Sequence, residues 1–481
     1  MSKIKNSYSL KKLNLVKNVT QNTKKGKVPI DKPVSLLGAF EELNIFYDID
    51  EIASSGNIVI KEQGNLIKAF PIVGLERLDI EFSIKSTSDS GNLDDKASET
   101  YSHSFFVYSV DQMADKGDTK IYTVRFADLS ALINVASRLE HRYVGKAEDI
   151  IKEICNVEMF TKHNIKNADD KSVPAMDVSI DTTTRFELDM IAPSWKPFDF
   201  ISKVASNAVS SNGNFNDCLF FQQTDGKFVF TDYLTLFKQN PIEFVKTPHV
   251  KPEVVSKYTI NEYKLNRLYN TQSQSRIGMF GTVTKIVDFS NMSIHSFVNY
   301  YFKGDTAEKE NPTYSALRID DVKKEDNVPN YIDSLMEPYY PKKEKGDPRF
   351  CSIKQSPAAC INIAACGFDQ TSVQKMAGGG AVQLDDTPAY QTPRYVVANG
   401  VPCNLNMRTK SAIFFLNPCT DLKLGQPVTI NMAGNRSEKS DISTIEEFLN
   451  GQWYIGKIKY TLTLTNIDVS VECYSTSLSL L

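Results

Sequence analysis

This chain of 481 residues lacks the features that mark membrane-spanning, disulfide-stabilised and zinc-binding proteins. No apolar run approaches the roughly 18 residues that a membrane-spanning helix needs, so we expect no membrane insertion. The N-terminus carries lysines but no apolar core or cleavage site, so it does not resemble a secretory signal. The 8 cysteines are too sparse for a disulfide scaffold and none has CxxC spacing. We therefore expect reduced, mostly buried thiols and assembly in a reducing cytoplasm.

Catalytic motifs are missing as well. The 5 histidines form neither HExxH nor another metal-ligand spacing, and no GxSxG elbow, phosphate-binding loop or dinucleotide fingerprint occurs. Paired carboxylates such as Asp94-Asp95 and Asp320-Asp321 stand in polar stretches, where glycosidase acids seldom lie. A nucleophilic Cys–His pair stays open, because its members meet only in the fold. We therefore predict no enzyme activity, no catalytic, metal-binding or cofactor-binding residues, and no cofactor.

The composition is that of an ordinary soluble globular protein, with 41% hydrophobic and 23% charged residues. A formal net charge of −3 argues against a nucleic-acid binder that acts through bulk positive charge. Trp195 and Trp453 are the only tryptophans, which is few for a sugar-binding surface, and we expect both to have packing roles. The length predicts about two to four domains.

Residues 1–29 are predicted to form a lysine-rich N-terminal arm. Residues 1–28 contain eight lysines and no acidic residue. Such a stretch is typical of a solvated tail. Two other interpretations are open: an arm that becomes ordered against an acidic neighbour in an assembly, and an arm that binds DNA.

Residues 30–127 are predicted to form a first small β-barrel domain. Within residues 75–85, Leu78, Ile80 and Phe82 alternate with polar residues, so one face of this strand is apolar and the other polar. Further short apolar runs bring about five strands into about 100 residues, which is typical of a small antiparallel barrel or sandwich.

Residues 128–255 are predicted to form an α+β domain. Asp128 is placed as the N-cap of an amphipathic helix, a second helix follows over residues 147–157, and a third begins at Pro197. Further along, Thr224-Asp225-Gly226 separates two apolar runs. This pattern predicts a β-hairpin in which the glycine adopts a positive φ.

Residues 256–298 and 396–481 are predicted to form a second small β-barrel domain, split by an inserted loop-rich domain at residues 299–395. Apolar residues alternate with polar ones over residues 458–464, and the phase of the alternation changes after Asn466. The insertion is rich in charge and proline. The predicted fold class is therefore α+β and mostly β, with two small antiparallel β-barrels, a helical α+β domain between them and an inserted loop-rich domain.

Four stretches together resemble a known family. They are a strand, turn and FPIVGLERLDIEF segment at 58–82, a strand leading into two helices from 122 onward, a tryptophan-led helix and hairpin at 195–230, and terminal strands that include 424–426 and 451–455. In this order they are similar to the baseplate central hub protein of contractile-tailed bacteriophages. The similarity covers about 30–300 and 396–481, and the remaining residues match nothing in the family.

The resemblance implies a structural protein of the virion tail baseplate that is assembled in the host cytoplasm. In this family a homotrimeric ring joins the central spike protein to the tail tube protein. Two similar tube-like barrels in each chain let three chains present six near-equivalent units. Tape-measure and baseplate wedge proteins are further expected partners, and DNA passes through the ring without specific binding. Basic walls would bind phosphate, so a near-neutral or mildly acidic channel is expected, with Asp79 and Glu81 as candidate lining acids.

Two other functions are open from the sequence alone. A receptor- or glycan-binding tail-tip module would present clustered exposed aromatic residues or metal-binding carboxylates on loops. A hydrolase embedded in a tail would bring Glu, His or Cys side chains together in a pocket.

Overall fold

The computed structural model describes residues 8–17, 20–23, 26–29, 33–63, 70–87, 93–116, 119–161, 176–211, 217–246, 258–267, 281–288, 293–300, 358–363, 408, 410–432 and 449–475. Strands dominate this part of the chain, so the prediction of a mostly β protein is confirmed. Most of the predicted insertion at 299–395 lies outside the described residues. No helix in the described ranges has the length and apolar character needed to cross a membrane.

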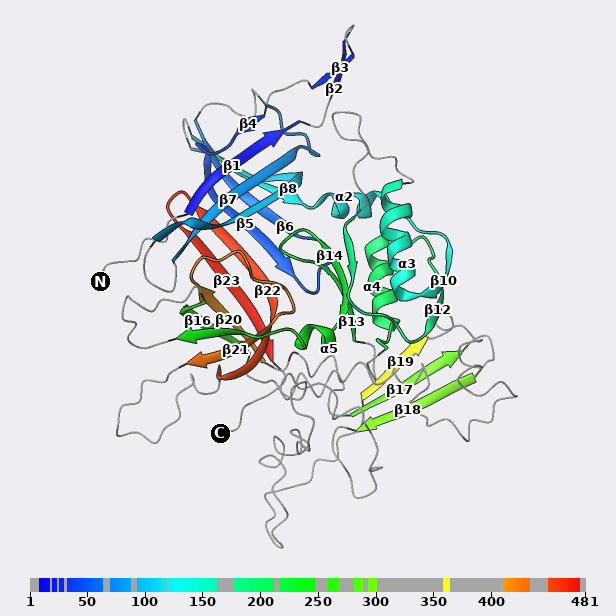
Figure 1. The fold of residues 1–481 in the computed structure, drawn as a ribbon. Coiled ribbons are helices and arrows are strands. Elements are labelled where there is room, and N and C mark those ends of the chain that lie inside the picture. The colour runs from blue at the N-terminus through cyan, green and yellow to red at the C-terminus, as the bar shows by residue number, and fades with distance from the viewer. Residues whose placement is uncertain are drawn as a thin grey trace, which may run out of the picture.

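A curled sheet of thirteen strands forms the body of the molecule (Figure 1). Its strands pair antiparallel, except that β15 and β21 run parallel. The order across the sheet is β16 (Ile260–Arg267), β20 (Lys410–Leu416), β23 (Ile467–Ser475), β22 (Gly451–Thr463), β5 (Phe40–Asp48), β6 (Ser55–Glu62), β9 (Thr119–Ala127), β8 (Leu93–Lys116), β7 (Arg77–Thr87), β1 (Tyr8–Val16) and β4 (Val34–Ser35), while β21 (Pro427–Met432) branches from β22 and pairs with β15 (Ile242–Lys246).

The alternation read from the sequence sets which face of each strand is buried. In β7, Leu78, Ile80 and Phe82 are at most 1% exposed. In β22 and β23 the phase changes at the turn where the Thr463 N–H bonds the Asn466 carbonyl. Because side chains alternate across a strand, each of these apolar sets faces one core.

Strands from the two ends of the chain meet in the middle of the sheet. β5 and β22 pair antiparallel over seven residues, from Lys457 opposite Asp48 to Thr463 opposite Glu42. Inside, the ring of Tyr460 from β22 packs 6.4 Å from Tyr47 of β5. The N-terminal and C-terminal β regions therefore share one sheet and one hydrophobic core.

A smaller core lies beside the sheet, between helices and short strands (Figure 1). Asp128 caps α2 by accepting from the Ser130 N–H at 2.9 Å, and Pro197 opens α4, both as predicted. The elements are α2 (Leu129–Ala136), β10 (Arg142–Lys146), α3 (Ala147–Glu153), the π-helical η1 (Ile154–Thr161), β11 (Val178–Ile180), β12 (Glu187–Ile191), α4 (Pro197–Asn207), β13 (Cys218–Gln222), β14 (Phe228–Asp232) and α5 (Tyr233–Phe237).

The structure differs from the sequence prediction at the N-terminus. Residues 8–16, predicted as part of the lysine-rich arm, form β1, which pairs with β7. Leu13 and Leu15 of this strand are at most 1% exposed. Lys11 and Lys12 directly precede these leucines in the strand, so the local charge obscured an ordinary period-2 pattern. Next along the chain, β2 (Thr20–Thr23) and β3 (Gly26–Pro29) form a separate hairpin.

Strand pairing also differs from the predicted second barrel. β15 lies in the section predicted as α+β, yet it pairs with β21 of the large sheet. β17 (Gly281–Asp288) and β18 (Ser293–Tyr300) pair with β19 (Ala358–Ile363) from the predicted insertion, and not with the large sheet. Local alternation identifies a strand but not its partner, which explains both differences.

Candidate assembly site

The side chains of four of the eight cysteines lie in the part of the chain that the structure describes. No group of three His, Cys, Asp or Glu side chains there could hold a metal ion. Cys155, Cys218, Cys419 and Cys473 are buried, as the sequence predicted for most of the thiols. Burial raises the pKa of the Cys155 thiol well above its ordinary value, which disfavours the nucleophilic thiolate.

Polar side chains of one hairpin form hydrogen bonds to segments that are distant in the sequence. β13, β14 and the turn between them form a hairpin, hereafter the joining hairpin, that reaches from the smaller core to the large sheet. Gly226 in its turn has φ of 87°, the left-handed conformation that the sequence predicted. This hairpin places Gln222, Gln223 and Thr224 between the two halves of the sheet.

Gln222 connects the joining hairpin to the N-terminal half of the sheet. Its side-chain oxygen accepts hydrogen bonds from the Ser54 N–H at 2.9 Å and the Ser54 hydroxyl at 2.7 Å. Its side-chain nitrogen donates to Asp128 Oδ2 at 3.1 Å and to the Gly226 carbonyl at 3.1 Å. Because Gln222 is only 2% exposed, replacing it would leave several buried polar groups unsatisfied.

Asp128 links this network to the start of α2. Besides capping the helix, its carboxylate lies 3.3 Å from Nε2 of His103 on β8. Burial acts to raise the pKa of Asp128, but the contacts from His103 and Ser130 outweigh it and hold the pKa below its ordinary value. The carboxylate therefore stays ionised and ties together strand, helix and hairpin.

Gln223 and Thr224 connect the same hairpin to the C-terminal half. The Gln223 side chain donates to the Leu424 carbonyl and accepts from the Leu424 N–H, both at 2.9 Å. The Thr224 hydroxyl donates to the Leu422 carbonyl at 2.8 Å. From the N-terminal half, Glu99 accepts from the Thr420 N–H at 2.9 Å. One loop of the C-terminal half is thus held by both other parts of the chain.

A cavity of about 360 Å³ lies between α4, β13 and the sheet. Arg408 lines it and forms a two-pronged ion pair with Asp50, which follows β5. The Arg408 guanidinium also lies 5.3 Å from the Tyr474 ring centre. Because residue 408 precedes β20, this pair fixes the chain where it enters the C-terminal half of the sheet.

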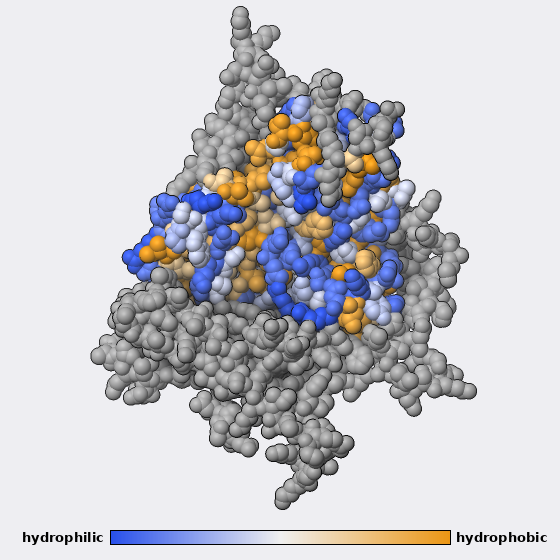
Figure 2. Space-filling view, turned by 180° about the vertical axis from the view of Figure 1, so that it is seen from behind, coloured by the Kyte–Doolittle hydropathy of each residue, from blue (hydrophilic) through white to orange (hydrophobic). Residues whose placement is uncertain are grey.

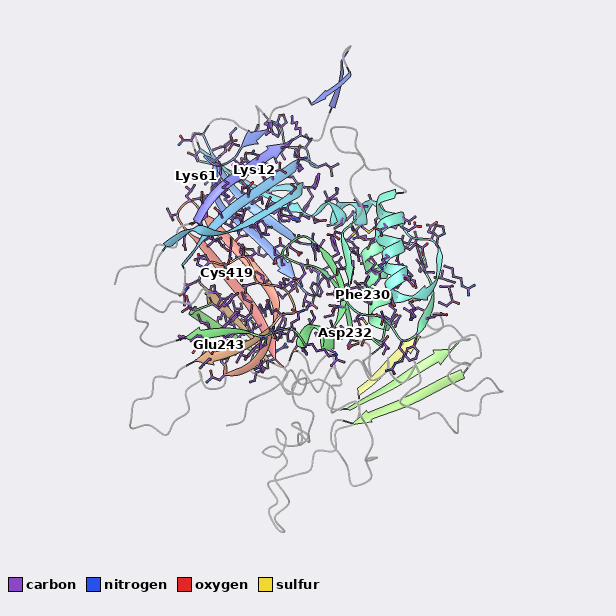
Figure 3. All side chains as sticks on the ribbon, in the orientation of Figure 1. Lys12, Lys61, Phe230, Asp232, Glu243 and Cys419 are labelled. Atoms are coloured by element: carbon purple, nitrogen blue, oxygen red, sulfur yellow. The ribbon has the colours of Figure 1, made fainter. Side chains whose placement is uncertain are left out.

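A buried carboxyl group stands next to the joining hairpin. Asp217 is 1% exposed, and neither of its oxygens has a partner within hydrogen-bonding distance. Burial and the neighbouring Asp232 carboxylate raise the Asp217 pKa to about 8, although nearby backbone N–H groups and Arg185 lower it somewhat. Asp232 ends β14 (Figure 3) and accepts from the Thr235 N–H at 2.7 Å.

The candidate channel acids behave differently from each other. Asp79 is 6% exposed and contacts Lys12 at 3.2 Å, Arg77 at 3.0 Å and the Ser104 hydroxyl at 2.7 Å. These partners outweigh burial and hold its pKa below the ordinary value. Asp79 is therefore buried and neutralised by two cations. Glu81 is more exposed than Asp79, since it is half-buried.

The sequence analysis did not single out the residues of this network. Gln222 and Gln223 follow the apolar residues 218–221 just before the predicted turn. Two polar residues at the end of an apolar strand were the one local indication of buried hydrogen bonds there. Arg408 and Asp50 are 358 positions apart, and nothing in either segment indicates the contact. Of the tryptophans, Trp453 is fully buried and Trp195 is 38% exposed, packed edge-on against Phe200 at 6.3 Å.

Comparison with known proteins rests on structure alone. No family model and no curated protein sequence matches the chain. The 43 kDa tail protein of prophage MuSo2 from Shewanella oneidensis is similar in structure, with a TM-score of 0.51, 9% identity, and coverage of 98% of this chain and 99% of that chain. A tail protein from Neisseria meningitidis MC58 gives a TM-score of 0.49 at 9% identity, covering 98% of each chain. The chain therefore has the fold of a prophage tail protein, in agreement with the resemblance to baseplate hub proteins drawn from its sequence.

Proposed function

We propose that this chain is the structural hub of a contractile-tail baseplate, forming a trimeric ring that joins the central spike to the tail tube and leaves a channel for DNA. The observation that carries the proposal is the pairing of β5 with β22, which joins two sets of antiparallel strands into one sheet. The fold of a prophage tail protein supports the same function.

Two tube-like units in each chain would match a threefold spike to a sixfold tube. The N-terminal unit comprises the strands from β5 to β4 on one side of the β5–β22 pair, and the C-terminal unit the strands from β22 to β16 with β21 and β15. Three chains then supply six units, arranged as a ring. In domain terms, the chain divides into two tube-like barrels, an α+β domain between them and an inserted domain.

Such a hub would require rigidity, because the two units of each chain must keep one arrangement for three chains to present six of them in a ring. The Gln222, Gln223 and Asp50–Arg408 contacts resist sliding of the two units and the helical part against one another. Buried polar contacts of this kind fix one arrangement, since any displacement leaves their partners unsatisfied. A purely apolar junction would allow small slips at lower cost.

As a hub, the chain would contact the central spike, the tail tube, and tape-measure and wedge proteins. Its location would be the virion tail. The proposed role is structural and not enzymatic. The alternative of a glycan-binding module gains no support from the exposed aromatic residues Tyr108 and Trp195, which lie on separate elements. DNA would pass through the ring without specific binding, and Asp79, which is buried and paired with Lys12 and Arg77, would add no free charge to the channel.

Electron microscopy of the purified chain, alone and co-expressed with its spike protein, tests the proposal. We expect ring-shaped particles with threefold symmetry, in which the β layer shows six similar densities around the axis. Particles with another symmetry, or with one barrel density per chain, would refute the hub function even if the chain remained part of a tail.

A further inference from the structure

Three acidic side chains are buried together at the root of the joining hairpin, the end where Cys218 of β13 pairs with Asp232 of β14. Figure 2 shows hydrophilic residues on much of the described surface, where charged groups meet water. Asp217, Asp232 and Glu148 are instead 1%, 0% and 7% exposed. Burial raises the pKa of the Cys218 thiol well above its ordinary value, and all three acids add to this effect. The three carboxyl groups therefore surround the start of β13.

Two of these three acids have hydrogen-bond donors, and the third does not. The Glu148 carboxylate accepts from the Thr184 N–H at 3.3 Å, and Asp232 caps the start of α5. Neither oxygen of Asp217 has a hydrogen-bond partner in the part of the chain that the structure describes. Arg185 lowers the Asp217 pKa, but less than burial and Asp232 raise it. Asp217 is therefore the acid of the root that is held in its neutral form.

The cavity of about 360 Å³ reaches the root at Cys218, one residue from this acid. The residues that line it from α4 carry no charge: Ser202, Ala205 and Ser206. Arg408, which also lines it, is already paired with Asp50. An ionised Asp217 would therefore face two carboxylates with Arg185 as its offset, while space for water lies one residue away.

The position of β13 allows the root to open without disrupting the rest of the fold. In the sheet β11–β14–β13 it is an edge strand, so among the described strands it pairs only with β14. The pair of Cys218 with Asp232 is the last of that ladder, whereas Gln222 and Gln223 anchor the opposite end of the hairpin to the large sheet. Folded proteins open such terminal segments at a lower cost in free energy than global unfolding requires.

We propose that Asp217 is a proton-dependent latch: it holds the root of the joining hairpin closed while protonated, and the root opens locally when the proton passes to solvent. Loss of the proton leaves a buried anion beside two other carboxylates, and opening of the root lets water solvate it. The hairpin then holds the smaller core against the large sheet less firmly. The latch belongs to a single chain, so it does not depend on the proposed hub function.

Cys218 reports the state of the root, because its buried thiol directly follows Asp217. The full chain and its Asp217→Asn variant are labelled with iodoacetamide in pulses at pH 6, 7 and 8, and the rate at each cysteine is measured by peptide mass spectrometry. The ratio of the wild-type rate to the variant rate at Cys218 cancels the ordinary effect of pH on a thiol. We expect this ratio to rise by about 10-fold or more between pH 6 and pH 8, because opening gains up to about 10-fold for each pH unit below the pKa of about 8.

Two other cysteines distinguish local opening from global unfolding. Cys155 is buried in the smaller core and Cys473 in the core of the large sheet. Burial alone raises the pKa of Cys155, so the acids of the root do not act on it. We expect neither thiol to follow the pH dependence of Cys218. Asp225→Asn removes an exposed carboxylate from the turn of the same hairpin and is the matched control, which should be labelled like the wild type.

Three results would overturn the latch. The first is a wild-type rate at Cys218 that rises with pH no more than the rate in Asp217→Asn. The second is labelling of Cys155 and Cys473 as fast as Cys218, because the chain would then unfold as a whole. The third is an Asp225→Asn chain that behaves like Asp217→Asn, since any carboxylate of the hairpin would then have the same effect. None of these results bears on ring formation, so the hub function is tested separately.

Discussion

Asp217 predicts an unusual pH dependence of stability. Its carboxyl group is buried without a hydrogen-bond partner and lies near Asp232, so its pKa of about 8 keeps it protonated at neutral pH. In the unfolded chain the same group ionises at about pH 4. The folded state must therefore hold a proton that the unfolded state releases.

The magnitude follows from the difference between the two pKa values. Because the folded pKa lies above the unfolded one, Asp217 does not lower the free energy of unfolding below about pH 4. The loss of stability grows as the pH rises above 4 and levels off near pH 8. At about 1.4 kcal/mol for each pH unit, the cost is about 4 kcal/mol at pH 7 and about 1 kcal/mol at pH 5. Asp217→Asn keeps the shape of the protonated acid without this cost. The variant should therefore be more stable than the wild type, and increasingly so towards pH 8.

Urea unfolding followed by tryptophan fluorescence at pH 5, 6, 7 and 8 measures the effect. Glu262→Gln, at an exposed position on β16, is the control for removal of one carboxylate. An Asp217→Asn chain that is destabilised, or whose gain is the same at pH 5 and pH 8, would show that the buried group is not held as a neutral acid.

Three other substitutions test the contacts that join the parts of the fold. Gln223→Ala leaves the N–H and carbonyl of Leu424 unsatisfied and should cost about 2–4 kcal/mol in urea unfolding, while the exposed Gln63→Ala should cost little. Asp128→Asn should destabilise at pH 7, and its effect on the free energy of unfolding should fade as the pH falls below about 4, where the unfolded chain binds a proton at this carboxyl, and vanish below the lowered pKa of the folded carboxyl. Gly56→Ala should lower the melting temperature measured by circular dichroism, because its new Cβ would lie 2.3 Å from the Asn44 carbonyl oxygen, and overpacking typically costs about 1–3 kcal/mol.

Local chemistry could be predicted from the sequence because it depends on neighbours along the chain. The alternation in β7, the Asp128 cap and the Gly226 turn all follow from side-chain periodicity or backbone preference within a few residues. For the same reason the mostly β character was predictable.

Partner choice could not be predicted, because it depends on residues far apart. Tyr460 meets Tyr47 across more than 400 positions, and neither strand alone determines that they pair. The same limit applies to the contact of Gln223 with Leu424 and to the pairing of β15 with β21. β1 was not predicted for a different reason. Lys11 and Lys12, next to Leu13, made the segment resemble a solvated tail, although Leu13 and Leu15 are buried.

The solution mass of the purified chain tests the central claim most directly. Native mass spectrometry, with and without the co-expressed spike protein, should show a species of three times the 54.0 kDa chain mass. Monomers or dimers under both conditions would contradict the account of three chains whose paired units form one ring.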